Sequence, residues 1–99
     1  MAGSQLVVPV RLTTAQSATE TDFYRHLHAA AAAAGCANGS PVPRNLDGLD
    51  ELLAAMSASV TVRVTAPGLS RLPRNRAIMV LAVCAANGVT VDARALPGG

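Results

Sequence analysis

The sequence predicts a small α/β domain in which helices connect three parallel strands. Three stretches, at residues 6–12, 60–65 and 89–93, are rich in the β-branched and apolar residues that strands favour. Two helical patterns separate the first stretch from the second, and one separates the second from the third. Helical connections of this length join parallel strands. The chain of 99 residues is therefore expected to form one domain in the order strand, helix, helix, strand, helix, strand.

The first strand, Leu6–Leu12, contains Pro9, which cannot donate a ladder hydrogen bond and so favours an edge position. A helix follows, for which either Ser17 or Thr19 could provide the N-terminal cap. Gly35 marks its end. Four of its residues have the spacing of a core-facing stripe: Phe23, Leu27, Ala30 and Ala34.

Asn45 is placed to cap a second helix, which should fade near Ala55–Ser59. Asp47 lies in its first turn, where a negative charge favours the helix dipole. Four apolar residues repeat on one face of this helix: Leu46, Leu49, Leu53 and Met56.

The last part of the chain predicts one more helix and one more strand. Residues 66–73 are expected to be irregular, because they contain two prolines and a glycine. Asn75 is then a candidate cap for a helix over Arg76–Ala86, and Gly88 lies just past its end. We expect residues 1–4 to be a disordered leader and residues 94–99 a flexible tail.

Composition narrows the function classes. The net charge of +2 is too small to indicate nucleic-acid binding by itself, although all eight basic residues are arginine. The longest apolar run, Ala77–Ala86, is about half of a membrane span, and no signal-peptide pattern begins the chain. We therefore expect a cytoplasmic protein in which Cys36 and Cys84 are free thiols.

The acidic residues are concentrated in the second helix. Asp47, Asp50 and Glu51 lie at i, i+3 and i+4, so a helix presents their three carboxylates on one face. The apolar stripe lies on another face of the same helix. The pattern predicts a compact negative surface on a rigid support, suited to a cationic partner.

The same segment carries a family resemblance. Asn45–Leu53 reads NLDGLDELL and resembles the NLDALxDCL signature of the barstar family, intracellular inhibitors of guanyl-specific microbial ribonucleases. Ala18–His28 resembles the first helix of that family, which usually reads DFYRxL or DLHxxL. Val60–Val64 and Ile78–Asp92 fall where the family places its second strand, last helix and third strand. The resemblance covers roughly residues 5–93 and implies a three-stranded parallel sheet flanked by helices.

The resemblance also implies a function and a binding site. Asn45 and Asp47 match the Asn and first Asp of the motif, Gly48 stands where Ala is usual, and Glu51 occupies the position of the second Asp, the main contact. The family would therefore use this helix to occlude the basic active site of a barnase-like ribonuclease. The expected partner-binding residues are Asn45, Asp47, Gly48, Asp50, Glu51, Ala54 and Asn87.

Several positions depart from the family pattern. Asp50 stands where barstar carries Trp, and Pro41 and Val42 replace its paired loop tyrosines. Val83 and Asn87 lie where the last helix would bring further acidic contacts. An alternative is therefore a protein-interaction module of the same fold that does not inhibit a ribonuclease.

A third interpretation is a small nucleic-acid-binding regulator. Arg71, Arg74 and Arg76 cluster near the start of the last helix, but no aromatic residue lies among them for base stacking. We expect neither direct nucleic-acid binding nor a membrane contact.

The sequence gives little support for an enzyme active site or a metal-binding site. Asp47 and Glu51 could form an acid–base pair, but no phosphate loop or nucleophile motif accompanies them. His26 and His28 are two residues apart on a helix and cannot hold one ion, although His28 could pair with Tyr24. The cysteines lack zinc-ligand spacing. We expect no catalytic activity, no cofactor and no metal.

Overall fold

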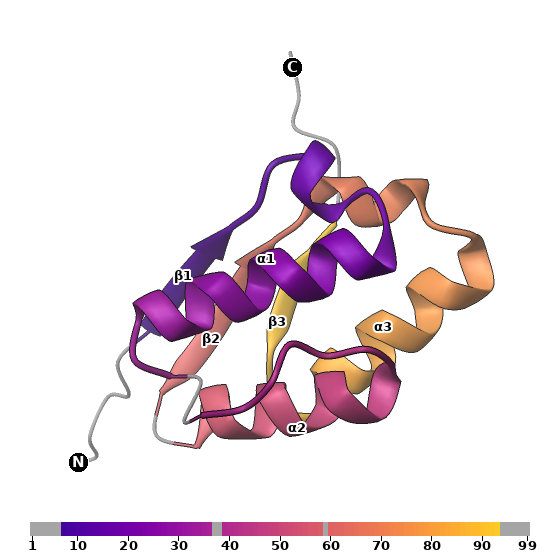
Figure 1. Ribbon diagram of the computed structural model, residues 1–99. Coiled ribbons are helices and arrows are strands. Elements are labelled where there is room, and N and C mark those ends of the chain that lie inside the picture. The colour runs from indigo at the N-terminus through magenta and orange to yellow at the C-terminus, as the bar shows by residue number, and fades with distance from the viewer. Residues whose placement is uncertain (1–6, 37–38, 59, 94–99) are drawn as a thin grey trace.

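The computed structural model describes residues 7–36, 39–58 and 60–93 and shows a small α/β protein with three parallel strands and three helices (Figure 1). Its main elements in chain order are β1 (Val7–Arg11), α1 (Glu20–Ala33), α2 (Leu46–Ser57), β2 (Thr61–Thr65), α3 (Arg74–Ala86) and β3 (Thr90–Asp92). The expected leader, residues 1–4, and the expected tail, residues 94–99, lie outside the described residues.

The sheet has the order β1-β2-β3, with both pairs parallel. β1 is an edge strand, and Pro9 lies opposite Arg63 of β2, which confirms the edge position that proline favours. Burial alternates along the strands: Val62 and Val64 are buried whereas Arg63 and Arg11 are exposed. The helices therefore cover one face of the sheet and leave the other, mostly polar face uncovered.

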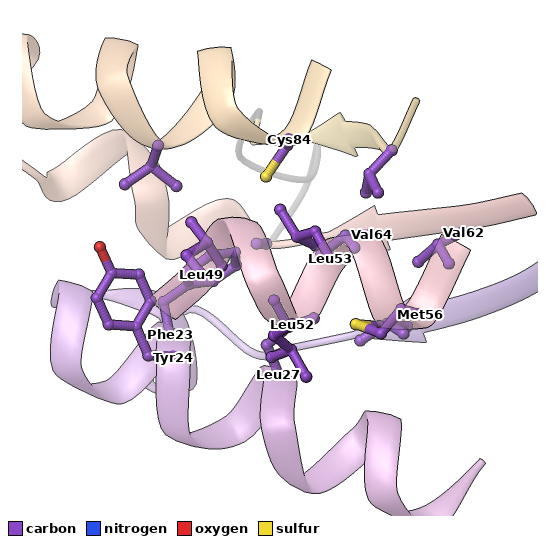
Figure 2. Packing of buried hydrophobic residues seen from close by; sticks show 14 of the residues in the cluster. Phe23, Tyr24, Leu27, Leu49, Leu52, Leu53, Met56, Val62, Val64 and Cys84 are labelled. Atoms are coloured by element: carbon purple, nitrogen blue, oxygen red, sulfur yellow. The ribbon is translucent and has the colours of Figure 1, made fainter. Parts of the chain in front are cut away.

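The core lies between this covered face and the three helices. Phe23, Tyr24 and Leu27 enter it from α1, and the two aromatic rings lie 6.1 Å apart between centroids. Figure 2 shows Leu27 of α1 and Leu52 of α2 pointing into the same layer. Most of the other buried residues are leucine, valine and alanine, so the core has the aliphatic composition that the sequence suggests.

Side chains cap the first two helices: Thr19, and not Ser17, caps α1, and Asn45 caps α2 as predicted. The Oγ1 atom of Thr19 accepts a hydrogen bond from the backbone N–H of Asp22, and the Oδ1 atom of Asn45 accepts one from Gly48. These contacts satisfy amide groups that have no partner inside the helix. Gly35, after α1, has a φ of 73°, a left-handed conformation that glycine adopts without strain.

The prediction for the start of the last helix was wrong. α3 begins at Arg74 with Pro73 at the N-cap, and no side chain caps it, so Asn75 lies inside the first turn. Proline suits a helix start because its φ is already close to helical and the N–H it lacks would have no partner. The stretch expected to be irregular contains a short 3₁₀ helix, η2 (Pro67–Arg71).

Two core positions also differ from the predicted stripes. Ala34 is exposed, because it is the C-cap residue of α1, and Ala31 is buried one turn after Leu27 instead. In α2, Leu46 is only partly buried, whereas Leu52 is fully buried against the rest of the core.

Candidate functional site

α2 has one buried face and one charged, exposed face. Its buried residues are Leu49, Leu52, Leu53 and Met56, each no more than 2% exposed. The exposed residues at i, i+3, i+4 and i+7 are Asp47, Asp50, Glu51 and Ala54. We call these four residues the acidic stripe. Because the opposite side of the helix is fully packed, the stripe is held on a rigid support.

The carboxylates of the acidic stripe differ in their partners. Elsewhere in the protein, Glu20 pairs with Arg76, and Asp22 pairs with Arg25. By contrast, Asp47 and Glu51 make no side-chain hydrogen bond or ion pair with any residue that the structure describes. These two carboxylates, one helical turn apart, remain available to an external cation.

Asp50 is tied to α3 instead. Its Oδ1 atom accepts a hydrogen bond of 2.7 Å from Nδ2 of Asn87, which also donates to the backbone oxygen of Val83. The structure thus brings Asn87 beside the acidic stripe. The bond fixes the edge of the stripe against the C-terminal end of α3.

Asn45 and Gly48 support the start of α2. The side-chain oxygen of Asn45 accepts a hydrogen bond from the backbone N–H of Gly48 and so caps the helix. This contact positions the first turn, which carries Asp47. A Cβ atom at Gly48 would lie 3.2 Å from Cα of Pro43, which is tight. The glycine therefore lets the preceding loop pack closely on the helix.

A contact that the sequence did not predict holds this loop. Nε2 of His28, on α1, lies 2.6 Å from the backbone oxygen of Ser40. The suggested pairing of His28 with Tyr24 was wrong, because the Tyr24 hydroxyl donates to Glu20 instead. The loop exposes Pro41 and also Val42, which is 43% exposed.

The arginine cluster near α3 is divided in the structure. Arg76 donates to both carboxylate oxygens of Glu20, at 2.5 and 2.9 Å, and thereby joins α3 to the start of α1. This contact holds the pKa of the Glu20 carboxyl below its ordinary value of 4.5. Burial raises the pKa of the adjacent Tyr24, as does its hydrogen bond to Glu20. Arg71 and Arg74 stay exposed, which leaves two of the three arginines for an outside contact.

The sulfur chemistry is that of separate thiols. Cys36 is partly exposed, and Cys84 is buried in the core, where desolvation raises the pKa of its thiol to about 12. Within residues 7–36, 39–58 and 60–93, no group of three acidic, histidine or cysteine side chains could hold a metal ion. None of the helices in this described part is long and apolar enough to cross a membrane.

The uncovered face of the sheet has a shallow depression of about 200 Å³. Its lining includes Arg11 and Arg63 together with the polar residues Thr65, Thr90 and Asp92. It lies on the face of the sheet away from the helices, so it is separate from the acidic stripe.

No protein-family model, no curated protein sequence and no solved structure matches this chain.

Proposed function

We propose that this protein is a barstar-like, stoichiometric inhibitor of a microbial, guanyl-specific ribonuclease. The observation that carries the proposal is the pair Asp47 and Glu51, exposed on α2 without a partner among the described residues while the back of the helix is fully buried. The likeness of Asn45–Leu53 to the barstar signature supports the same assignment.

The proposed mechanism is occlusion. A ribonuclease active site binds phosphate through arginine and lysine, so a rigid pair of carboxylates can occupy the positions of substrate phosphates. Arginine–carboxylate contacts are directional and charge-assisted, which gives the complex a fixed geometry. Because α2 is already packed and capped, little conformational entropy is lost when it binds.

The acidic stripe would act with its neighbours. Asp50 and Asn87 border the pair on the α3 side, and Val42 offers apolar surface on the loop side in place of the tyrosines of the family. Ala54 leaves the stripe open at its far end. We propose that such a protein acts in the cytoplasm as an antitoxin or immunity factor and has no catalytic activity of its own.

An inhibition assay tests this function. Purified protein is titrated against a panel of guanyl-specific microbial ribonucleases, with Glu51→Ala as the test variant and Asp22→Ala as the matched control. Asp22 is also an acidic helix residue, but it pairs locally with Arg25 on α1. We expect one protein to inactivate one enzyme, and Glu51→Ala alone to weaken inhibition.

Two other outcomes would favour the alternatives. If no ribonuclease in the panel is inhibited, the better assignment is a protein-interaction module of the same fold that does not inhibit ribonucleases. If the protein instead binds RNA directly and Arg74→Ala removes that binding, it would be a nucleic-acid-binding regulator.

A further inference from the structure

α3 is apolar on the side that faces solvent as well as on the side that faces the core. Val80 and Cys84 are buried, yet Ile78 is 56% exposed and Met79 is 42% exposed. A helix that is apolar all round is normally buried on all sides. From Ala77 onward, the exposed residues that share its outward side are Ile78, Met79, Ala82, Ala85 and Ala86, which we call the α3 outer face. The exposed polar residue Asn75 lies on the same side, in the first turn.

We propose that the α3 outer face binds the same face of a second copy of this chain, with the two helices antiparallel about a two-fold axis. Residue size along the face supports this arrangement. The two bulky residues, Ile78 and Met79, lie in the first half of the helix, and the three alanines lie in the second half. An antiparallel pair places the bulky residues of each copy over the alanines of the other, whereas a parallel pair would place bulk against bulk.

Charge supports the same partner and the same direction. The N-terminal end of α3 carries Arg74, which is exposed and has no partner among the described residues, and its first turn has no acidic residue. The C-terminal end has no basic residue in its last turn, and Asp50 lies against it through Asn87. In an antiparallel pair, Arg74 of each copy approaches the negative C-terminal end of the other helix.

The expected dimer is weak and reversible. A helix of 13 residues is about 20 Å long, so its outer face covers less than the roughly 800 Å² per partner of a standard interface. We therefore expect a dissociation constant on the order of 100 μM. The net charge of only +2 does little to oppose association. This inference is independent of the proposed ribonuclease inhibition.

Sedimentation equilibrium, with a reducing agent present, tests the dimer between about 10 μM and 1 mM. The average mass should rise with concentration from 10.0 kDa toward twice that value. Ile78→Glu should raise the dissociation constant by roughly 100-fold, since it buries an unpaired charge in the contact. Val7→Glu adds the same charge at an exposed apolar residue of β1, away from α3, and should leave association unchanged.

A cross-linking experiment tests the geometry. In a Cys36→Ser background, Ala82→Cys places a thiol near the proposed two-fold axis, and diamide as oxidant should join two copies through one disulfide. Ala29→Cys, at an exposed alanine of α1, is the matched control and should stay monomeric. The proposal is overturned if the wild-type mass stays at that of a monomer, if Ile78→Glu associates as well as the wild type, or if both cysteine variants cross-link equally.

Discussion

Nδ2 of Asn87 lies 2.7 Å from Oδ1 of Asp50, and this hydrogen bond joins the end of α3 to the exposed face of α2. It holds one carboxylate of the acidic stripe and leaves Asp47 and Glu51 without a partner among the described residues. The outer surface formed by α2 and α3 thus contains a fixed acidic edge, two open carboxylates and an apolar helix face.

Replacement of Gly68 should destabilise the fold strongly. A Cβ atom at this position would lie 2.1 Å from the backbone oxygen of Thr14 and 2.6 Å from the backbone nitrogen of Ala18. Both are backbone atoms that cannot rotate away. The segment around Thr14–Ala18 and the segment around Gly68 would therefore have to separate. We expect Gly68→Ala to lower the free energy of unfolding by more than about 3 kcal/mol in urea denaturation. An unfolding midpoint equal to that of the wild type would show that the segments are not packed this closely.

Ser17 should stabilise the contact between its own segment and Gly68 through hydrogen bonds. Its buried hydroxyl donates to the backbone oxygen of Thr13 at 2.9 Å and accepts from the N–H of Gly68 at 2.8 Å. Ser17→Ala leaves that buried N–H without an acceptor, which costs about 1–3 kcal/mol of unfolding free energy. Denaturation beside Ser70→Ala, which removes an exposed serine of η2, provides the comparison.

Local contacts could be predicted from the sequence, whereas the contact between Ser17 and Gly68 could not. The caps by Thr19 and Asn45 were predictable, because each contact spans three residues and depends on local backbone geometry. The bond between Ser17 and Gly68 spans 51 residues, and no periodic pattern marks either position.

In the candidate site, too, the local arrangement could be predicted from the sequence and the contacts between helices could not. The i, i+3, i+4 spacing predicted that the three carboxylates of α2 share a face, and the structure places them on its exposed side. That Asp50 pairs with Asn87 depends on how α3 packs beside α2. The pairing of Glu20 with Arg76 depends on how α3 lies against α1. Neither arrangement can be predicted from one segment alone.

The ion pair of Glu20 and Arg76 should make stability depend on pH. The pKa of Glu20 is lower in the folded protein than its ordinary value of 4.5, because Arg76 stabilises the carboxylate. The pair therefore stabilises the fold above pH 4.5 and loses this effect as the pH falls through the lower folded pKa. Glu20→Gln should have a lower Tm than the wild type at pH 7. The difference should shrink below pH 4.5 in thermal scans, and a constant difference across this range would contradict the assignment.

The two cysteines should differ in reactivity. Cys36 is partly exposed, whereas Cys84 is 1% exposed and burial raises the pKa of its thiol to about 12. A thiol reagent such as Ellman's reagent should label one thiol per native chain quickly and the second only after denaturation. Cys36→Ser should abolish the rapid reaction. Rapid labelling of both thiols in the native protein would show that the core opens readily around Cys84.

The central claim is that the acidic stripe binds the active site of a ribonuclease, and titration calorimetry of the purified protein against guanyl-specific microbial ribonucleases tests it most directly. We predict saturable binding with a stoichiometry of one to one. Glu51→Ala should weaken it by about 2–5 kcal/mol, since it removes one partner of a buried charge pair. Asp22→Ala should bind like the wild type. Equal affinity of the Glu51→Ala variant and the wild type, or no binding to any enzyme of this class, would contradict the claim.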